Sequence, residues 1–253
     1  AERKKMNSFM SWVGGKKNLR DEVLARFPPY YERYIEAFGG AGWVLFHKPP
    51  GADFEVYNDF NSNLANLYRC VRDKPAKLKY KLRYVLDSRE DFEYLALLHK
   101  RGILPRLYDV DRAAKFYQLI RYSYASGLDS FGSQPHSMWS DFPMIDLAAR
   151  RLQKVVVENK DFEKLIKQYD RPVSFFYCDP PYFATENYYK DVGFTAKDHI
   201  RLRDALLDIK GRFLVSYNDC PEIREIWHKP NLHIEEISRL NNLAQRYDGG
   251  CQY

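Results

Sequence analysis

The segment "FFYCDPPYF", residues 175–183, places a carboxylate, two prolines and a tyrosine directly after an apolar run. Asp-Pro and Pro-Pro pairs are common in turns, so one interpretation is simply a strand followed by a turn. Proline also fixes φ and stiffens the chain. A carboxylate and an aromatic ring on such a rigid corner suit a site that holds a flat, amino-bearing ring, and this segment alone leaves both interpretations open.

A second candidate site is the segment "YIEAFGGAGWVLF", residues 34–46, which predicts a strand, a tight glycine turn and an apolar helix. Glycines allow a ligand to approach the backbone closely at the carboxyl end of a strand. The spacing differs from the G-x-G-x-x-G dinucleotide pattern, and no lysine-serine pair follows as in a phosphate-binding loop. Asp59 ends the next predicted strand, about 20 residues further on, where an acid can accept hydrogen bonds from both ribose hydroxyls. The pair indicates a nucleoside cofactor, unless Asp59 only caps the following helix.

These residues need secondary-structure elements that bring strand ends together. Short apolar runs predict strands at residues 33–38, 53–59, 154–159, 173–179, 212–219 and 232–238. Helical patterns separate several of them, at residues 61–73 and at residues 195–211, where an S/T-x-x-D capping box opens the helix and a glycine closes it. Alternating strands and helices predict an α/β fold with a parallel sheet. The alternation stops between about residues 75 and 153, which predicts a largely helical insertion.

The bulk composition excludes several classes of protein. The chain has 253 residues, of which 45% are hydrophobic, so it can bury a sizeable core and is not disordered. No apolar run approaches the roughly 20 residues of a membrane span, and no signal stretch follows the basic N-terminus. The four cysteines, at positions 70, 178, 220 and 251, lack C-x-x-C spacing. This argues against a zinc site or a disulfide framework, and we expect a cytoplasmic protein without a metal or a membrane partner.

Charge and aromatic content suggest the class of partner. The formal net charge is +6 and aromatic residues make up 16% of the chain. Basic and aromatic residues alternate closely in residues 77–90 and 113–127, a combination that suits phosphates and bases. The alternative is that these aromatic rings belong to the core and that the lysines form a solvated face.

Four sequence blocks carry a resemblance to a known family. They occur in the order "SWVGGKKNL" (11–19), "EAFGGAGWVLF" (36–46), "VYNDFNSNLANLY" (56–68) and "YCDPPYF" (177–183). In this order they resemble the Dam-type family of DNA adenine-N6 methyltransferases, which use S-adenosylmethionine, and the likeness covers nearly the whole chain. The resemblance implies a Rossmann-like methyltransferase sheet, built from residues 1–61 and 154–253, with a mostly helical target-recognition domain at residues 62–153.

The resemblance also implies a set of cofactor-binding residues. They are Trp12 and Lys16 around the methionine part, Phe38, Gly39 and Gly40 in the turn beneath it, Asp59 at the ribose, Asp161 and Phe162 beside the adenine, and Asp179. For Trp12 and Phe162, ordinary core packing is the competing interpretation.

The catalytic residues implied by the resemblance are Asp179, Pro180, Pro181 and Tyr182. The amino group of adenine is a poor nucleophile because its lone pair is delocalised into the ring. The Asp179 carboxylate and the Pro180 carbonyl can each accept one N–H, which favours a pyramidal nitrogen and offsets its developing positive charge. Tyr182 offers a face for stacking, and an adenine of double-stranded DNA must be flipped out of the duplex to reach it. This chemistry requires no metal.

The insertion is expected to bind DNA through residues similar to those of the family. Arg121, Tyr122 and Tyr124 are candidates for phosphate or base contacts, and Lys77 and Lys79 for phosphate contacts. Family members that read GATC usually carry a G-L-C-R-like run in this region, whereas this chain has "GLDSFGS" at residues 127–133. Recognition of GATC is therefore not implied.

Two rival functions remain after this comparison. Methyltransferases of protein glutamine and of many RNAs tend to carry N-P-P-Y, so Asp179 favours a nucleic-acid adenine but leaves RNA open. A DNA-binding relative without turnover is the second rival, which the intact Asp179, Pro180 and Tyr182 oppose. A cognate restriction endonuclease is a further candidate partner.

Overall fold

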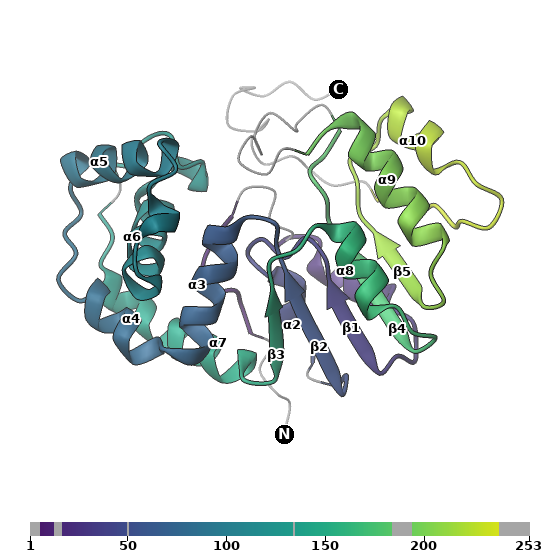
Figure 1. Cartoon of the computed structure of the whole chain (residues 1–253), viewed down its shortest axis with the longest axis horizontal. Helices are drawn as coiled ribbons and strands as arrows, with labels where there is room; N and C mark the ends of the chain where they lie inside the picture. The colour runs from purple at the N-terminus through teal and green to yellow at the C-terminus, as the bar shows by residue number, and fades with distance from the viewer. Residues whose placement is uncertain (1–5, 13–16, 50, 134, 184–193, 238–253) are drawn as a thin grey trace, which may run out of the picture.

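Five short apolar segments form one parallel sheet, which lies at the centre of the computed structural model (Figure 1). The structure describes residues 6–12, 17–49, 51–133, 135–183 and 194–237. The strand order is β3-β2-β1-β4-β5, and the strands are β1 (Arg33–Glu36), β2 (Phe54–Asn58), β3 (Val155–Glu158), β4 (Ser174–Cys178) and β5 (Arg212–Val215). The predicted α/β fold with a parallel sheet is confirmed.

Alternate residues along the strands point to opposite faces of the sheet. Tyr34 and Phe175 belong to one hydrophobic core, whereas their neighbours Ile35 and Phe176 belong to the other. The first face is covered by α1 (Arg20–Ala25), α2 (Trp43–His47), α3 (Ser62–Asp73) and α7 (Phe142–Leu152). The second face is covered by α8 (Phe162–Tyr169), α9 (Ala196–Leu207) and α10 (Pro221–Trp227).

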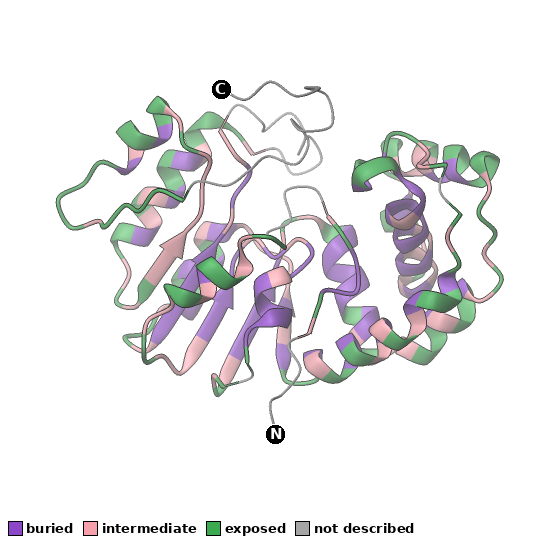
Figure 2. Cartoon of the chain, turned by 180° about the vertical axis from the view of Figure 1, so that it is seen from behind, coloured by how far each residue is buried: buried purple, intermediate pink, exposed green. Residues whose placement is uncertain are grey.

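A helical lobe, residues 75–141, extends from α3 at one side of the sheet (Figure 1). It contains α4 (Pro75–Leu82), α5 (Arg89–Lys100), α6 (Asp109–Tyr122) and the short 3-10 turns η1 (Leu104–Arg106), η2 (Tyr124–Ser126) and η3 (Met138–Asp141). One hydrophobic core runs from the sheet through α3 into α6, and Figure 2 shows the buried residues continuing into the lobe. The predicted division into a catalytic and a target-recognition domain stays a prediction.

Side-chain caps begin the two helices that follow the site loops. The Asn61 side chain accepts hydrogen bonds from the backbone N–H groups of Asn63, at 2.9 Å, and Leu64, at 3.3 Å, and so begins α3. Thr195 and Asp198 form the predicted capping box of α9. That helix ends at Leu207, four residues before the glycine at which we expected it to close.

The prediction of a strand at residues 232–238 is wrong for the part of it that the structure describes. Residues 232–237 form no strand, and Ile234 and Ile237 expose their side chains. An isolated apolar run becomes a strand only when a neighbouring strand takes its backbone hydrogen bonds. Ion pairs hold this segment instead, from Glu236 to Arg224 at 2.6 Å and from Glu235 to Arg26 at 2.5 Å.

The observed strands also end earlier than predicted. The prediction for residues 212–219 continued four residues past the observed end of β5 at Val215, and β1 ends at Glu36 instead of residue 38. The extra residues belong to the loops that follow the strands, which form the candidate site described below. Within the described ranges, no helix combines the length and apolar character needed to cross a membrane.

A buried ionic cluster joins α7 to the sheet near the amino ends of the strands. Arg151 donates hydrogen bonds to Glu55 at 2.6 and 2.9 Å and to the Leu45 carbonyl at 3.0 Å. Lys48, which is almost fully buried, also donates to Glu55. Because these charges lie away from water, removal of one partner leaves the others without full compensation.

We expect Arg151→Met to lower the free energy of unfolding by about 3 kcal/mol, because the Glu55 carboxylate loses two donors and the Leu45 carbonyl loses one. Urea unfolding monitored by circular dichroism measures this change. The matched control is Arg224→Met, which removes two ion pairs on the exposed surface, with Asp219 and Glu236, and should change the unfolding midpoint much less. Equal effects of the two substitutions would contradict the structural role of the buried cluster.

Candidate active site

The candidate site lies where β1 and β4 pair at the centre of the sheet. The chain leaves β1 toward β2 on one side and returns to β4 on the other, so the strand order reverses direction between them. In open α/β sheets, ligands bind outside the carboxyl ends of the strands at such a point. The glycine turn follows β1 and Asp179 follows β4, and the Ala37 N–H donates to the Tyr177 carbonyl at 3.0 Å. The structure therefore brings together two segments that are far apart in the sequence.

The glycine turn requires glycine for two separate reasons. A Cβ atom at Gly39 would lie 2.1 Å from the ring of Tyr57, a buried side chain stacked on Tyr68 with ring centroids 3.8 Å apart. Gly40 has a φ of +48°, in the left-handed region, and a Cβ there would lie 3.1 Å from the Trp12 ring. The Tyr57 hydroxyl donates to the Gly40 carbonyl at 2.7 Å and fixes the turn. Trp12 thus lies against the turn, and its contact with the methionine part of a cofactor stays a prediction.

Asp59 links the ends of β1 and β2. Its carboxylate accepts hydrogen bonds from the backbone N–H groups of Gly40, at 2.9 Å, and Asn61, at 2.8 Å. Burial raises the pKa of Asp59 to about 6, and these two backbone donors oppose the shift. Each carboxylate oxygen has two lone pairs, so the group retains acceptor capacity for two further hydroxyl donors. Asn159, which sequence reasoning did not single out, donates to the Asp59 carbonyl at 2.8 Å.

Phe162, which we expected beside the cofactor adenine, belongs to an aromatic cluster with Phe38 of the turn. Phe38 and Phe162 have ring centroids 5.6 Å apart, and Phe194 lies within 6 Å of both. Asp161 caps α8 through the Glu163 N–H at 3.1 Å and forms an ion pair with Arg201 at 3.0 Å. Sequence reasoning missed Phe194 and Arg201, because both come from the region around α9 and meet α8 only in the fold.

The predicted catalytic loop, residues 179–183 and called the catalytic loop below, begins directly after β4. Pro180 and Pro181 are buried, whereas Asp179 and Tyr182 are partly exposed. The Ser216 hydroxyl donates to Asp179 Oδ1 at 3.0 Å. At the other end of the loop, the Asn218 side chain accepts from the Phe183 N–H at 3.1 Å and donates to its carbonyl at 3.4 Å. The role of Asn218 is therefore to bind this loop. Lys16 lies outside the described residues.

The sequence profile of D12 class N6 adenine-specific DNA methyltransferases matches residues 12–242 of the chain. The chain belongs to this family. It is 30% identical to the Type II methyltransferase M1.LlaDCHI of Lactococcus lactis subsp. cremoris, over 93% of this chain and 89% of that protein. It is 27% identical to the DNA adenine methylases of Escherichia coli and Vibrio cholerae, over 93% of this chain and 89% and 90% of those proteins.

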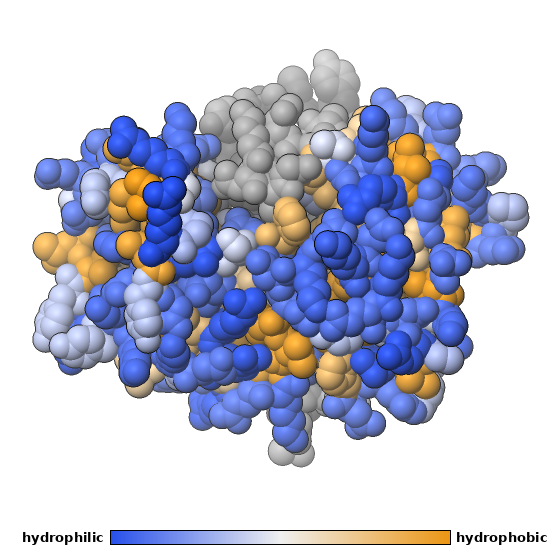
Figure 3. Space-filling model, viewed as in Figure 1, coloured by the Kyte–Doolittle hydropathy of each residue, from blue (hydrophilic) through white to orange (hydrophobic). Residues whose placement is uncertain are grey.

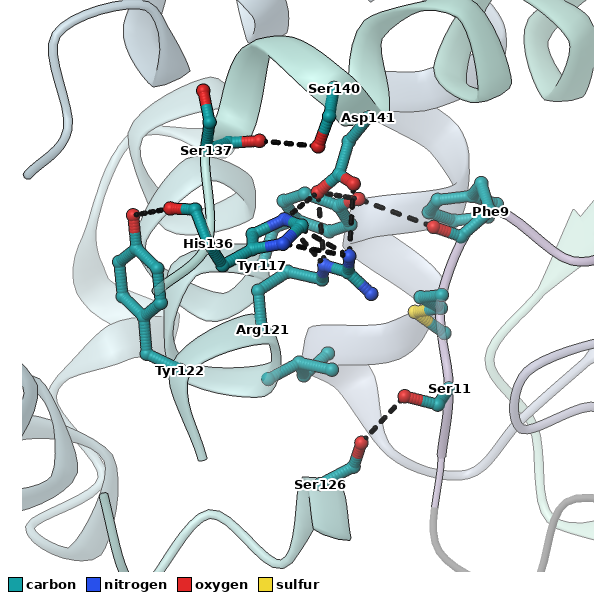
Figure 4. Close-up of polar contacts among 12 residues, drawn as sticks. Phe9, Ser11, Tyr117, Arg121, Tyr122, Ser126, His136, Ser137, Ser140 and Asp141 are labelled. Carbon is teal, nitrogen blue, oxygen red and sulfur yellow. Dashed lines mark hydrogen bonds and ion pairs between the residues drawn. The ribbon is translucent and has the colours of Figure 1, made fainter. Parts of the chain in front are cut away.

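Arg121 and Tyr122, which we expected to contact DNA, belong to a polar network inside this adenine methyltransferase (Figure 4). Arg121 forms an ion pair with Asp141 at 2.9 Å and donates to His136 at 3.2 Å. The Tyr117 hydroxyl donates to the same Asp141 at 2.9 Å. Tyr122 is 3% exposed, and its hydroxyl donates to the His136 carbonyl at 3.4 Å. Both residues stabilise the loop that follows α6, and their contacts with DNA stay a prediction.

Tyr124 lies in the loop after α6, close to the glycine turn of the methyltransferase. Its side chain is 59% exposed. Backbone hydrogen bonds from Tyr124 to Ser130 and from Gly132 to Tyr122, both 2.7 Å, close the loop like a short hairpin. Ser126 contacts Ser11 at 2.9 Å, next to Trp12 (Figure 4). The loop that carries Tyr124 is therefore linked to the segment that packs against the glycine turn.

Lys77 and Lys79 lie on α4, at the opposite end of the helical lobe from the catalytic edge. Helix α3 starts beside the carboxyl end of β2 and runs back along the sheet, so α4 begins near the amino ends of the strands (Figure 1). Lys79 forms an ion pair with Asp146 at 2.6 Å. The face seen in Figure 3 is largely hydrophilic, with hydrophobic patches at the edge of the lobe. Tyr80, also on α4, exposes its side chain. A DNA contact by the two lysines stays a prediction that their position does not favour.

Glu36, at the end of β1, is a buried acid that sequence reasoning also missed. It is 2% exposed and accepts a hydrogen bond from the Tyr34 hydroxyl at 2.7 Å. Burial raises the pKa of Glu36 to about 8, and the negative charge of Asp179 adds to the shift. Within the part of the chain that the structure describes, no group of His, Cys, Asp and Glu side chains could hold a metal ion.

The free energy of unfolding of the wild type should fall as pH rises, and Glu36→Gln should make this fall smaller. The folded protein keeps a proton on Glu36 up to about pH 8, whereas the unfolded chain releases it near the ordinary value of 4.5. The Glu36 contribution therefore falls by up to about 1.4 kcal/mol per pH unit in this window. Urea unfolding at about pH 5, 6.5 and 8 checks whether the variant gains stability relative to wild type as pH rises. Parallel profiles of unfolding free energy against pH would contradict a buried, protonated Glu36. Asp59 is present in both proteins, so its titration cancels from the difference between them.

Proposed function

We propose that this adenine methyltransferase transfers a methyl group from S-adenosylmethionine to the N6 amino group of an adenine flipped out of double-stranded DNA. The observation that carries the proposal is the meeting of the catalytic loop with the glycine turn at the switch point of the sheet. Family membership supports an adenine of DNA as the target. The sequence that surrounds this adenine stays open.

The residues at the switch point fit S-adenosylmethionine. Gly39 and Gly40 leave a turn without side chains beside the Trp12 ring, and Asp59 has acceptor capacity for the ribose hydroxyls. Phe38, Phe162 and Asp161 offer aromatic faces and an acceptor for the adenine of the cofactor. In the free protein Arg201 occupies part of the acceptor capacity of Asp161.

The catalytic loop supplies the acceptors for the target base. The Asp179 carboxylate and the Pro180 carbonyl each accept one N–H of the adenine amino group, and Tyr182 stacks on the ring. When bound, S-adenosylmethionine would supply an electrophilic methyl group on a sulfonium, and loss of that methyl group to the amino nitrogen would leave a neutral thioether. The nitrogen then carries one proton too many, and Asp179 is the nearest proposed acceptor to receive it and release it to water. Pro180 and Pro181 fix the direction of the carbonyl before the base enters.

Asp179→Asn should lower N6-methyladenine formation by at least about 100-fold while leaving the fold intact, because a neutral amide neither offsets the positive charge that develops on the nitrogen nor receives its proton. Unmethylated genomic DNA is incubated with the protein and S-adenosylmethionine, and the digested nucleosides are quantified by mass spectrometry. Full activity of the variant would overturn the assignment of Asp179. Product on RNA but not on DNA would keep the chemistry and change the substrate. A partner restriction endonuclease stays a prediction.

Tyr124→Ala should weaken duplex DNA binding by about 10-fold, because the exposed hydroxyl is a candidate donor to a phosphate and a hydrogen bond to a charged group contributes about 1.5–3 kcal/mol. Tyr80→Ala is the matched control: Tyr80 is 61% exposed and Tyr124 59%, but Tyr80 lies on α4, away from the catalytic edge. Fluorescence anisotropy at one fixed salt concentration measures both affinities. A larger loss with Tyr80→Ala would move the DNA interface to the other end of the lobe.

A further inference from the structure

The segment after β5 contacts the catalytic loop at both of its ends. Ser216 and Asn218, two residues apart, bind Asp179 and Phe183 respectively. The backbone holds this segment in place, because the Ser216 N–H donates to the Cys178 carbonyl at 3.0 Å, one position beyond the last pair of β4 and β5. The contact between Ser216 and Asp179 is therefore set by the register of two paired strands.

The direction of each hydrogen bond at Ser216 follows from the chemistry of its partners. A carboxylate accepts only, so the single hydroxyl hydrogen of Ser216 goes to Asp179 Oδ1 at 3.0 Å. The Tyr177 hydroxyl lies 3.2 Å from Ser216 Oγ and must then be the donor in that pair. Tyr177 is 1% exposed, and burial raises its pKa well above the ordinary value, so it keeps its proton at neutral pH. The result is a directed chain from Tyr177 through Ser216 to Asp179.

We propose that Ser216 is the positioning residue of Asp179, and that Tyr177 fixes the orientation of the Ser216 hydroxyl. A carboxylate can rotate about the bond to its side chain, and only one range of rotation directs an oxygen at the adenine amino group. A hydrogen bond to Oδ1 selects one rotation and thereby gives the second oxygen a defined direction before the base arrives. Ser216 does not touch the reacting atoms, and it acts through Asp179. This inference rests on the proposed catalytic role of Asp179.

Ser216→Ala should lower the single-turnover methylation rate by about 10–100-fold, because a misdirected acceptor no longer matches the transition state. The KM for DNA should change by less than about 3-fold, since the bases that flank the target are bound elsewhere. Ser216→Thr keeps a hydroxyl at the same position and should recover most of the rate. Ser140→Ala, an exposed serine of the helical lobe, is the control and should match wild type.

Tyr177→Phe supplies the test that a merely structural role would not pass. It removes one hydroxyl and keeps the buried ring, so the protein should fold and the rate should fall by a few-fold, on the order of one neutral hydrogen bond. Because Tyr177 acts through Ser216, the double variant Ser216→Ala, Tyr177→Phe should be no slower than Ser216→Ala alone. A full additive loss would overturn the directed chain.

The outcomes separate this inference from the function on which it rests. If Asp179→Asn keeps wild-type activity, the proposed catalytic role itself fails. If Asp179→Asn is inactive but folded Ser216→Ala stays within about 2-fold of wild type, only the positioning role fails. If Ser216→Ala does not fold, the rates of Ser216→Thr and Tyr177→Phe decide: a Thr variant near wild type with a slower Phe variant supports the proposal, and any other pair of results overturns it.

Discussion

The parallel pairing of β1 with β4 is the constraint on which the site depends. Glu36 pairs with Tyr177 in the register of the two strands, so both strands end at the same level of the sheet. The next residues of one strand form the glycine turn, and those of the other form the catalytic loop. A register shift of one residue would move every side chain of a strand to the opposite face, and the two hydrophobic cores prevent this. Burial of the strands therefore fixes the position of the glycine turn relative to residues 179–183.

Three acids gather at this end of the sheet: Glu36 keeps its proton at neutral pH, and the charges of Asp59 and Asp179 suit a cationic ligand. Burial raises the pKa values of Glu36 to about 8 and of Asp59 to about 6, and Asp179 adds to the shift of Glu36. A protein gains no stability from this arrangement, because like charges and desolvation both disfavour the ionised forms. A positively charged ligand offsets that cost. The site is acidic within a chain of net charge +6, so the local field favours a sulfonium cofactor and the overall charge favours a polyanion such as DNA.

The sequence predicted the parts of the fold that local patterns determine. Apolar runs located β1 to β5, glycine spacing located the turn, and the Thr195 capping box located the start of α9. The predicted strand at residues 232–238 failed because an apolar run does not reveal whether a partner strand is available. Arg121 and Tyr122 were expected to contact DNA, which stays a prediction, and the sequence did not show that Arg121 pairs with Asp141 and that Tyr122 donates to the His136 carbonyl. Ser216 was missed for the same reason, since its contact with Asp179 exists only through strand pairing.

Residues 8–12 couple the helical lobe to the glycine turn. The Phe9 carbonyl accepts from Tyr117 of α6 at 3.2 Å, and Ser11 contacts Ser126 at the end of the Tyr124 loop. The same segment reaches the turn, because Ser8 donates to the Ala41 carbonyl and Trp12 packs against Gly40. A close-packed core transmits displacement because it has little free volume to absorb it. A displacement of the Tyr124 loop must therefore either move residues 8–12 and the glycine turn with it, or break these contacts. The Tyr124 loop and the glycine turn thus share one packed connection through residues 8–12.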